Sequence, residues 1–186
     1  MSDVYQPAED TFLLIDAVMD LPNFERAIEV GSGSGVVSVA LACKAEYLIS
    51  TDIDLKSCYA TLERLREHGR RTGTDVVCCD LLSAFRETPI FELIVFNPPY
   101  LPSEQVQDVS VFGGEHGIET SVEFLRQASC RLSRSGRILL VASSLSDVDR
   151  LRQTASKLGL QYKTLRYVRL FFEELQVIEF RNETYK

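Results

Sequence analysis

The sequence has 186 residues, 45% of them apolar, and a formal net charge of −7. This length predicts one domain with a sizeable core. We expect it to span residues 1–186, with an N-terminal helical segment over residues 1–25 packed on the rest. The acidic balance argues against direct nucleic-acid binding, since phosphate contact needs clustered Lys and Arg. No apolar run reaches membrane-spanning length, so no membrane partner is expected.

The cysteines and the N-terminus bear on metal binding and location. The five cysteines are Cys43, Cys58, Cys78, Cys79 and Cys130. None forms a CxxC pair, and the two histidines lie far apart, so no metal site is predicted. We expect buried free thiols in a reducing compartment. The N-terminus shows no signal-peptide pattern. The expected location is the cytoplasm, and the sequence leaves a nuclear pool open.

Helical and strand patterns alternate along the chain, which is typical of an α/β protein with a mainly parallel sheet. Helices are predicted at 7–20, 36–43, 55–71, 121–132 and 146–158, and strands at 27–30, 46–51, 75–79, 91–96 and 136–142. Ser146 is expected to cap the last of these helices and Gly159 to end it. Two final β-rich runs, 162–171 and 175–180, are joined by a link too short for a crossover helix. We expect them to pair antiparallel.

Glycines alternate with small residues where the first strand meets the next helix. Gly31, Gly33 and Gly35 stand where backbone must approach a ligand closely. A dinucleotide fingerprint requires its third glycine one position later, where this chain has Val36. A nucleotide-dependent oxidoreductase is therefore disfavoured. A glycine-rich turn without a ligand is the alternative.

Acidic side chains follow the next two strands. Asp52 ends the second strand about twenty residues after the glycine loop, where a carboxylate can accept from both ribose hydroxyls. Asp80 ends the third strand, where it could accept from an adenine amino group. Each alone is equally compatible with a turn or a helix cap, and Asp54 can cap the following helix. Their joint position at the carboxyl ends of parallel strands, where ligands bind, favours a site.

The fourth predicted strand runs into Asn97-Pro98-Pro99-Tyr100. Two prolines end ladder pairing and force the chain out of the sheet. The carbonyl groups of Asn97 and Pro98 are then free to accept, the Asn97 amide accepts and donates, and Tyr100 supplies a flat ring. This combination suits a planar group that carries N–H2. A proline-stiffened turn is the alternative.

These motifs resemble those of class I S-adenosylmethionine-dependent methyltransferases, with residues 29–35 as cofactor loop and 97–100 as methyl-acceptor motif. The resemblance implies a Rossmann-like fold with a seven-stranded, mainly parallel sheet, a C-terminal antiparallel hairpin and helices on both faces. It implies S-adenosyl-L-methionine contacts from Thr11, Glu29, Gly31, Gly33, Gly35, Asp52, Asp80, Leu81 and Asn97. The implied catalytic residues are Asn97, Pro98, Pro99 and Tyr100.

The resemblance narrows at residues 4–14 and 112–119, which are similar to eukaryotic and archaeal HemK-like methyltransferases. These enzymes methylate the glutamine of the Gly-Gly-Gln loop in class I translation release factors. Gln6 departs from the family, which more often has Glu. The rival functions are adenine-N6 methylation of DNA or RNA and a catalytically silent binding subunit, and lysine methylation as a side activity stays open.

The long loop after the acceptor motif contains Gly113, Gly114 and Gly117, which would let it approach a Gly-Gly-Gln segment closely. A mobile surface loop is the alternative, and we expect His116 to be solvated rather than a base.

The third strand is normally an edge in this fold, and here its residues 76–79 are apolar without a Lys or Pro. A bare apolar edge is a liability unless it is covered. The resemblance implies a small zinc-binding activator protein, which we expect to add a strand beside Val76 to Cys79. Cover by a helix of the chain itself is the alternative.

Overall fold

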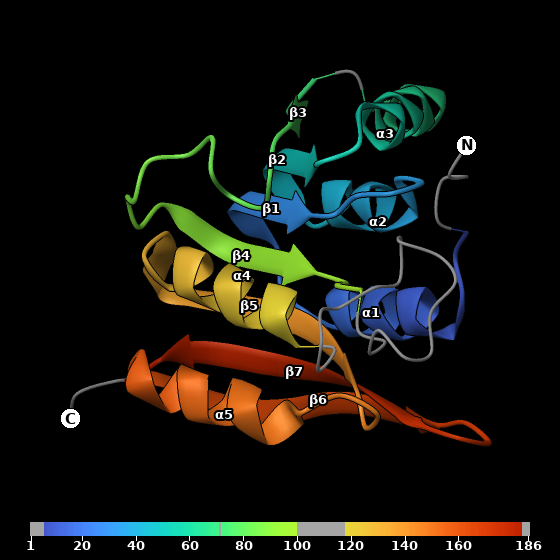
Figure 1. Cartoon of the computed structure of the whole chain (residues 1–186). Coiled ribbons are helices and arrows are strands. Elements are labelled where there is room, and N and C mark those ends of the chain that lie inside the picture. The colour runs from blue at the N-terminus through green and yellow to red at the C-terminus, as the bar shows by residue number, and fades with distance from the viewer. Residues whose placement is uncertain (1–5, 71, 100–117, 184–186) are drawn as a thin grey trace.

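The computed structural model describes residues 6–70, 72–99 and 118–183, which form one seven-stranded sheet flanked by helices (Figure 1). The helices are α1 (Glu9–Met19), α2 (Val36–Ala42), α3 (Leu55–Glu67), α4 (Glu119–Ser129) and α5 (Val148–Lys157). The strands are β1 (Phe24–Val30), β2 (Ala45–Asp52), β3 (Thr74–Cys78), β4 (Phe91–Phe96), β5 (Leu132–Ser143), β6 (Leu160–Arg169) and β7 (Glu174–Asn182).

The strand order is β3-β2-β1-β4-β5-β7-β6. The first five strands of the chain pair in parallel, whereas β7 runs antiparallel to both β5 and β6. This confirms the predicted fold, including the C-terminal antiparallel hairpin and the position of β3 at an edge. Because the parallel strands all end at one edge of the sheet, the segments that follow them meet there.

Alternate residues of each strand face two separate cores. Ile94 and Phe96 of β4 pack in the core that α4 and α5 cover, and these two helices lie in front of the sheet in Figure 1. Leu93 and Val95 pack in the core that α1, α2 and α3 cover. Helices therefore cover both faces, as predicted. By the same alternation, the residue after Phe96 is directed toward the face that α1 covers.

Side chains set the starts of two helices. Asp54 caps α3, because its Oδ1 accepts a first-turn backbone N–H at 3.2 Å. The prediction that Ser146 caps α5 is wrong. Asp147 is the cap, accepting the N–H of Arg150 at 3.0 Å, while the Ser146 hydroxyl donates to the carbonyl oxygen of Ser143 at 2.7 Å.

The helix α3 ends at Glu67, earlier than predicted, because a glycine terminates it. Gly69 has φ +72°, and the N–H groups of Gly69 and Arg70 bond back into the last turn at 3.1 and 2.8 Å. This is the hydrogen-bond pattern of a Schellman motif. Gly159, with φ +69°, ends α5 as predicted.

The strand β5 begins at Leu132, four residues before the predicted strand, whose start was missed because the next three residues are polar. Leu132 pairs with Phe91, and the register shifts before Arg137 pairs with Leu93. Gly136 is needed at this irregularity, since a Cβ there would lie 2.9 Å from the carbonyl oxygen of Phe91.

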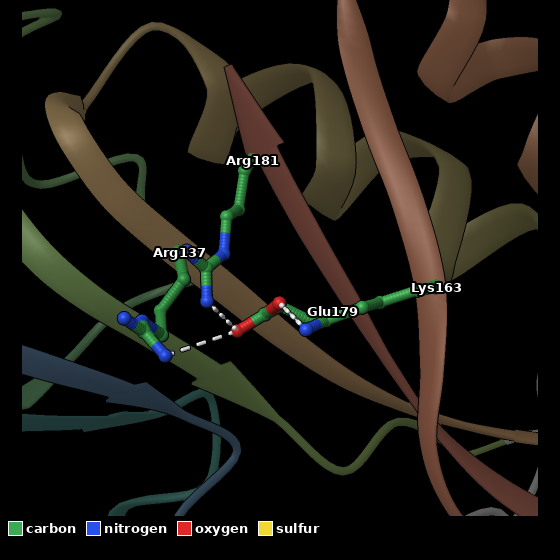
Figure 2. Close-up of polar contacts among 4 residues, drawn as sticks. All are labelled: Arg137, Lys163, Glu179 and Arg181. Carbon is green, nitrogen blue, oxygen red and sulfur yellow. Dashed lines mark hydrogen bonds and ion pairs between the residues drawn. The ribbon is translucent and has the colours of Figure 1, made fainter. Parts of the chain in front are cut away.

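Among the last three strands, β7 carries a buried carboxylate that three cations surround (Figure 2). The Glu179 side chain is 1% exposed and accepts from Arg137 at 3.2 Å and from Arg181 at 2.8 Å. The Nζ atom of Lys163 lies 3.3 Å from its other oxygen. Because Arg137 comes from β5 and Lys163 from β6, the cluster ties the last three strands together.

All five cysteines are free thiols, but only Cys58 is buried, and Cys43, Cys78 and Cys130 are exposed. The expectation of buried thiols is therefore wrong for most of them. Within the described residues, no group of three His, Cys, Asp or Glu side chains is arranged to hold a metal ion. None of the described helices is long and apolar enough to cross a membrane.

Candidate functional site

The loop after β1 is built on three glycines in left-handed backbone. Gly31, Gly33 and Gly35 have φ values of +67°, +52° and +76°, a region that favours glycine. A Cβ on Gly31 would lie 3.0 Å from the Phe96 ring, and one on Gly35 would lie 2.7 Å from the Cα of Thr61. The loop therefore follows a path that side chains would block, and bare backbone is what a ligand can approach closely.

Asp52 lies directly beside this loop. Its Oδ2 accepts the N–H of Gly33 at 2.8 Å, and its Oδ1 accepts the N–H of Asp54 at 2.9 Å. Burial raises the pKa of the Asp52 carboxyl, against the lowering effect of these backbone hydrogen bonds. Each carboxylate oxygen keeps a further lone pair, so the group can still accept from two neighbouring hydroxyls.

Glu29 faces inward, beneath the glycine loop. Its Oε2 accepts a short hydrogen bond from the Ser38 hydroxyl on α2 and a second from Ser50 at 3.3 Å. Burial raises the pKa of Glu29 to about 8, although both hydroxyls oppose the shift. The group is therefore largely protonated near neutral pH. Its described contacts are internal, so contact with a cofactor stays a prediction.

The segment after β3 contributes Asp80, which is exposed, and Leu81. Among the described residues, Leu81 alone apart from glycine has a positive φ, +47°. Its carbonyl oxygen accepts from the Thr51 hydroxyl at 3.2 Å, and the same hydroxyl lies 3.3 Å from the carbonyl oxygen of Glu29. Strained backbone held by its surroundings clusters at ligand sites. Leu81 is therefore fixed to Thr51 of β2, the strand beside the one that leads into the glycine loop.

Asn97 follows β4 and turns toward α1. Its Nδ2 donates to the Oδ2 of Asp10 at 3.1 Å. Its Oδ1 is buried and has no hydrogen-bond partner among the described residues. An unpaired buried acceptor costs about 1–3 kcal/mol, and such an atom in a native structure calls for an explanation. The amide has one anchored side and one open acceptor.

Asp10 is a site residue that sequence reasoning missed. It is 2% exposed, and its Oδ1 accepts from the N–H of Thr11 at 2.6 Å and from the Thr11 hydroxyl at 3.2 Å. An acidic residue in the first turn of a helix is explained by the helix dipole alone. Its contact with Asn97 spans 87 residues, so nothing in the local pattern indicates it.

Thr11 was expected to contact a cofactor. Besides bonding Asp10, its Oγ1 accepts the N–H of Ala8 at 3.4 Å, which secures the start of α1. This places Thr11 beside the residue that holds Asn97. Its role toward a ligand stays a prediction.

The glycine loop, Asp52, Asp80 and Asn97 all lie at or just after the carboxyl ends of parallel strands, at one edge of the sheet, as predicted. Pro98 is buried and Pro99 half-buried. Several residues with predicted roles at the site lie outside the described residues, namely Tyr100, Gly113, Gly114 and Gly117, as does His116, which was expected to be solvated. Groups that accept hydrogen bonds dominate the described part of the site. This chemistry fits a ligand rich in hydroxyl and amino groups.

Comparison with known proteins adds to this geometry. Residues 9–169 match the family described as the methyltransferase small domain. The chain is 36% identical over 194 residues to Methyltransferase HEMK2 of Mus musculus. The match covers 96% of this chain and 89% of the mouse protein. It is 28% identical over 183 residues to a Methanocaldococcus jannaschii protein that is named as a protein N5-glutamine methyltransferase. That match covers 95% of this chain and 90% of the relative.

Among solved structures, the chain resembles one from the E. cuniculi Mtq2–Trm112 complex, described as responsible for methylation of the eRF1 translation termination factor. The TM-score is 0.72 at 24% identity, and the match covers 97% of this chain and 99% of that chain. At this identity the likeness concerns the fold alone.

Proposed function

We propose a function from the family to which this chain belongs, the HEMK2 methyltransferases with a methyltransferase small domain. The chain methylates the side-chain amide nitrogen of a glutamine in a class I translation release factor. The acceptor is the glutamine of the factor's Gly-Gly-Gln loop, and the methyl donor is S-adenosylmethionine. The names of the M. jannaschii relative and of the E. cuniculi complex, which refer to N5-glutamine and to eRF1, support this substrate.

The orientation of Asn97 is the observation that carries the proposal. Its Nδ2 is occupied by Asp10, so Oδ1 is the atom left to meet a ligand. A buried acceptor selects a partner that brings N–H groups, because only a hydrogen bond offsets its desolvation. A primary amide nitrogen brings two such groups, and Asn97 with the Pro98 carbonyl provides two acceptors.

The residues at the strand ends fit the methyl donor. Because a Cβ on Gly31 or Gly35 would collide with Phe96 or Thr61, only glycine lets the loop keep its course and present bare backbone to a ligand. Asp52 retains lone pairs for ribose hydroxyls. The residues that would hold the donor are Thr11, Gly31, Gly33, Gly35, Asp52, Asp80, Leu81 and Asn97, with Glu29 beneath the loop. S-adenosylmethionine, when bound, supplies an electrophilic sulfonium methyl group.

The protein's task is to position a poor nucleophile. An amide nitrogen shares its lone pair with the carbonyl, so alignment and close approach are needed. Asn97 Oδ1 and the Pro98 carbonyl oxygen accept the two N–H bonds and fix the nitrogen. As positive charge develops on the nitrogen, the same acceptors stabilise it. Tyr100, which lies outside the described residues, is expected to supply a flat face for the amide, and the proton is expected to leave to solvent after transfer.

Labelled methyl transfer tests this function directly. The acceptors are a release factor, its Gln-to-Ala variant and DNA, assayed in parallel. We expect label in the unaltered factor alone.

The variant Asn97→Ala tests the acceptor role of Asn97. It should lower transfer by about a hundred-fold or more while donor binding survives in part, because it removes an acceptor that stabilises developing charge. The control is Asn23→Ala, at an exposed asparagine, which should leave transfer unchanged. Label in the variant factor or in DNA, or an active Asn97→Ala enzyme, would overturn the proposal.

We also propose that a small zinc-binding partner subunit adds a strand to β3, and that the complex acts in the cytoplasm. The edge strand has an exposed Cys78 and half-buried Val76 and Val77. Two backbone groups near the ends of β3 face β2: the N–H of Cys79 donates to the Asp52 carbonyl oxygen, and the Gly73 carbonyl oxygen accepts from the N–H of Leu48. By alternation, the backbone groups of Val76 and Cys78 therefore point outward and are open to a further strand. The second protein named with the E. cuniculi structure supports such a partner.

This backbone alternation gives a test of the partner. Cys78→Pro removes an outward N–H and spares the pairing with β2, as proline is tolerated on edge strands. We expect Cys78→Pro to abolish co-purification with a co-expressed Trm112-type protein. Cys78→Val keeps the N–H and should still co-purify. Equal recovery of the partner with both variants would place the interface elsewhere.

A further inference from the structure

We infer that Asp10 is a positioning residue for the methyl acceptor: its carboxylate fixes the Asn97 amide so that Oδ1, and not the N–H2 group, meets the substrate. This inference rests on the proposed function. It assigns a role to α1, a helix that contributes no residue to the acceptor motif itself.

The first step is the chemistry of the contact. A carboxylate can only accept hydrogen bonds. An asparagine amide has nearly the same shape at both ends, but its oxygen accepts and its N–H2 group donates. Asp10 Oδ2 lies 3.1 Å from Asn97 Nδ2. The N–H2 group must face Asp10, because turning the amide over would set two acceptors against each other. The opposite end, Oδ1, is then turned away from Asp10.

The second step is the rigidity of Asp10 itself. Its Oδ1 accepts two hydrogen bonds from Thr11, at 2.6 and 3.2 Å, and Thr11 in turn accepts from Ala8. Three donors thus converge on one buried carboxylate, which suits an acceptor-only group at the N-terminus of a helix. The carboxylate is held by the first turn of α1, independently of Asn97.

The third step is energetic. Asp10 is buried, and Asn97 is partly buried with its Oδ1 atom fully so. A hydrogen bond to a charged group is stronger in such surroundings. Without it, the buried Oδ1 could turn toward the helix, and the amide would present two donors to a substrate N–H2. Two donors facing each other would prevent binding in a productive orientation.

The variant Asp10→Asn tests this directly, because it keeps shape and removes the polarity. The Thr11 donors require the oxygen of the new amide, so the N–H2 group of that amide would face the N–H2 group of Asn97. Asn97 relieves this by turning over, which directs its own N–H2 at the substrate. We expect kcat to fall by about a hundred-fold, with little change in the KM for the release factor. The matched control is Asp16→Asn, at an exposed position of the same helix, which should not change kcat.

The decisive variant exchanges the two side chains. In Asp10→Asn/Asn97→Asp, the new amide donates to one oxygen of the new carboxylate, and the other oxygen accepts from the substrate. We expect at least ten-fold more activity than either single variant, on the order of the coupling between contacting residues. Asn97→Asp alone sets two carboxylates against each other and should be inactive. A double variant no better than both singles, or a fully active Asp10→Asn enzyme, would overturn the inference.

A readout without substrate separates this inference from the proposed function. The side-chain amide signal of Asn97 in a ¹⁵N spectrum is identified by its loss in Asn97→Asp. We expect its protons to exchange more slowly than those of the exposed Asn23, and the protection to vanish in Asp10→Asn but not in Asp16→Asn. Protection unaffected by Asp10→Asn would reject the contact. Unaltered enzyme that shows this protection but transfers no methyl to the factor would reject the proposed function alone.

Discussion

Two glutamates are buried in the sheet and are ionised differently. Glu29 lies on β1 under the glycine loop at 3% exposure, and Glu179 lies on β7, three strands away in the sheet order, at 2%. Glu29 is bonded by the hydroxyls of Ser38 and Ser50, and burial raises its pKa to about 8. The Glu29 carboxyl is therefore mainly neutral at pH 7.

Glu179 has charged neighbours instead. Burial on its own would raise its pKa, but the hydrogen bond from Arg181 and the charges of Arg181, Lys163 and Arg137 outweigh it and hold the pKa below its ordinary value. Figure 2 shows how the three cations surround this one carboxylate. Glu179 is thus ionised at neutral pH and balances part of the positive charge.

The difference shows that partners, more than depth of burial, determine the charge of a buried acid. On β1, a neutral Glu29 fixes the helix and strand beneath the glycine loop by hydrogen bonds alone. This leaves Asp52 as the acid that faces the loop backbone. On β7, the charge of Glu179 holds β5, β6 and β7 together. The same substitution at both sites should therefore have unequal effects.

The largest effect is expected for Glu179→Gln. It leaves Arg137, which is mostly buried, without its carboxylate, whereas Lys163 and Arg181 are more exposed and can turn to water. We expect the free energy of unfolding at about pH 5 to fall by about 3 kcal/mol, as when one partner of a buried ion pair is removed. Urea denaturation followed by circular dichroism measures it.

The control for this variant is Glu183→Gln, at an exposed glutamate just beyond β7, which should change stability by less than about 0.5 kcal/mol. Lowering the pH sharpens the comparison. The folded-state pKa of Glu179 lies below 4.5, so its contribution is present above pH 4.5 and is lost as the pH falls through that lower pKa. The gap between wild type and Glu179→Gln should close in acid. A gap that persists there would show that packing, and not charge, explains it.

The two buried acids also show how far sequence reasoning reaches. The alternation of helices and strands and the meeting of Asp52 with the glycine loop follow from local pattern and from the geometry of parallel sheets. The edge position of β3 follows from the family resemblance. The ionisation of Glu29 and Glu179 does not. It depends on which side chains from other strands and helices face each acid, which only the register determines.

The same limit explains why the role of Asp10 was missed. Strand alternation directs Asn97 to one face of the sheet, but the sequence does not say which helix covers that face. Once α1 packs there, a first-turn acid meets the acceptor motif across 87 residues. The positive φ of Leu81 is likewise set by its surroundings, because no leucine prefers it by itself. The predicted start of β5 was wrong because pairing with β4 extends the strand through polar residues that local pattern excludes.

The smallest effect is expected for Glu29→Gln at about pH 5, where an amide replaces a neutral acid of the same shape and stability should change by less than about 1 kcal/mol.

The pH dependence of stability is the sharper test of Glu29. The folded-state pKa of Glu29, about 8, lies above the ordinary 4.5, so the folded protein keeps a proton that the unfolded chain releases between these values. This stabilisation is complete below pH 4.5 and declines as the pH rises to about 8, by about 1.4 kcal/mol per pH unit for one proton. The wild-type protein should lose stability across this window, and Glu29→Gln should remove that slope while Glu179→Gln leaves it intact. An unchanged slope in Glu29→Gln would mean that Glu29 is ionised in the folded protein and that the contrast between the two buried acids does not hold.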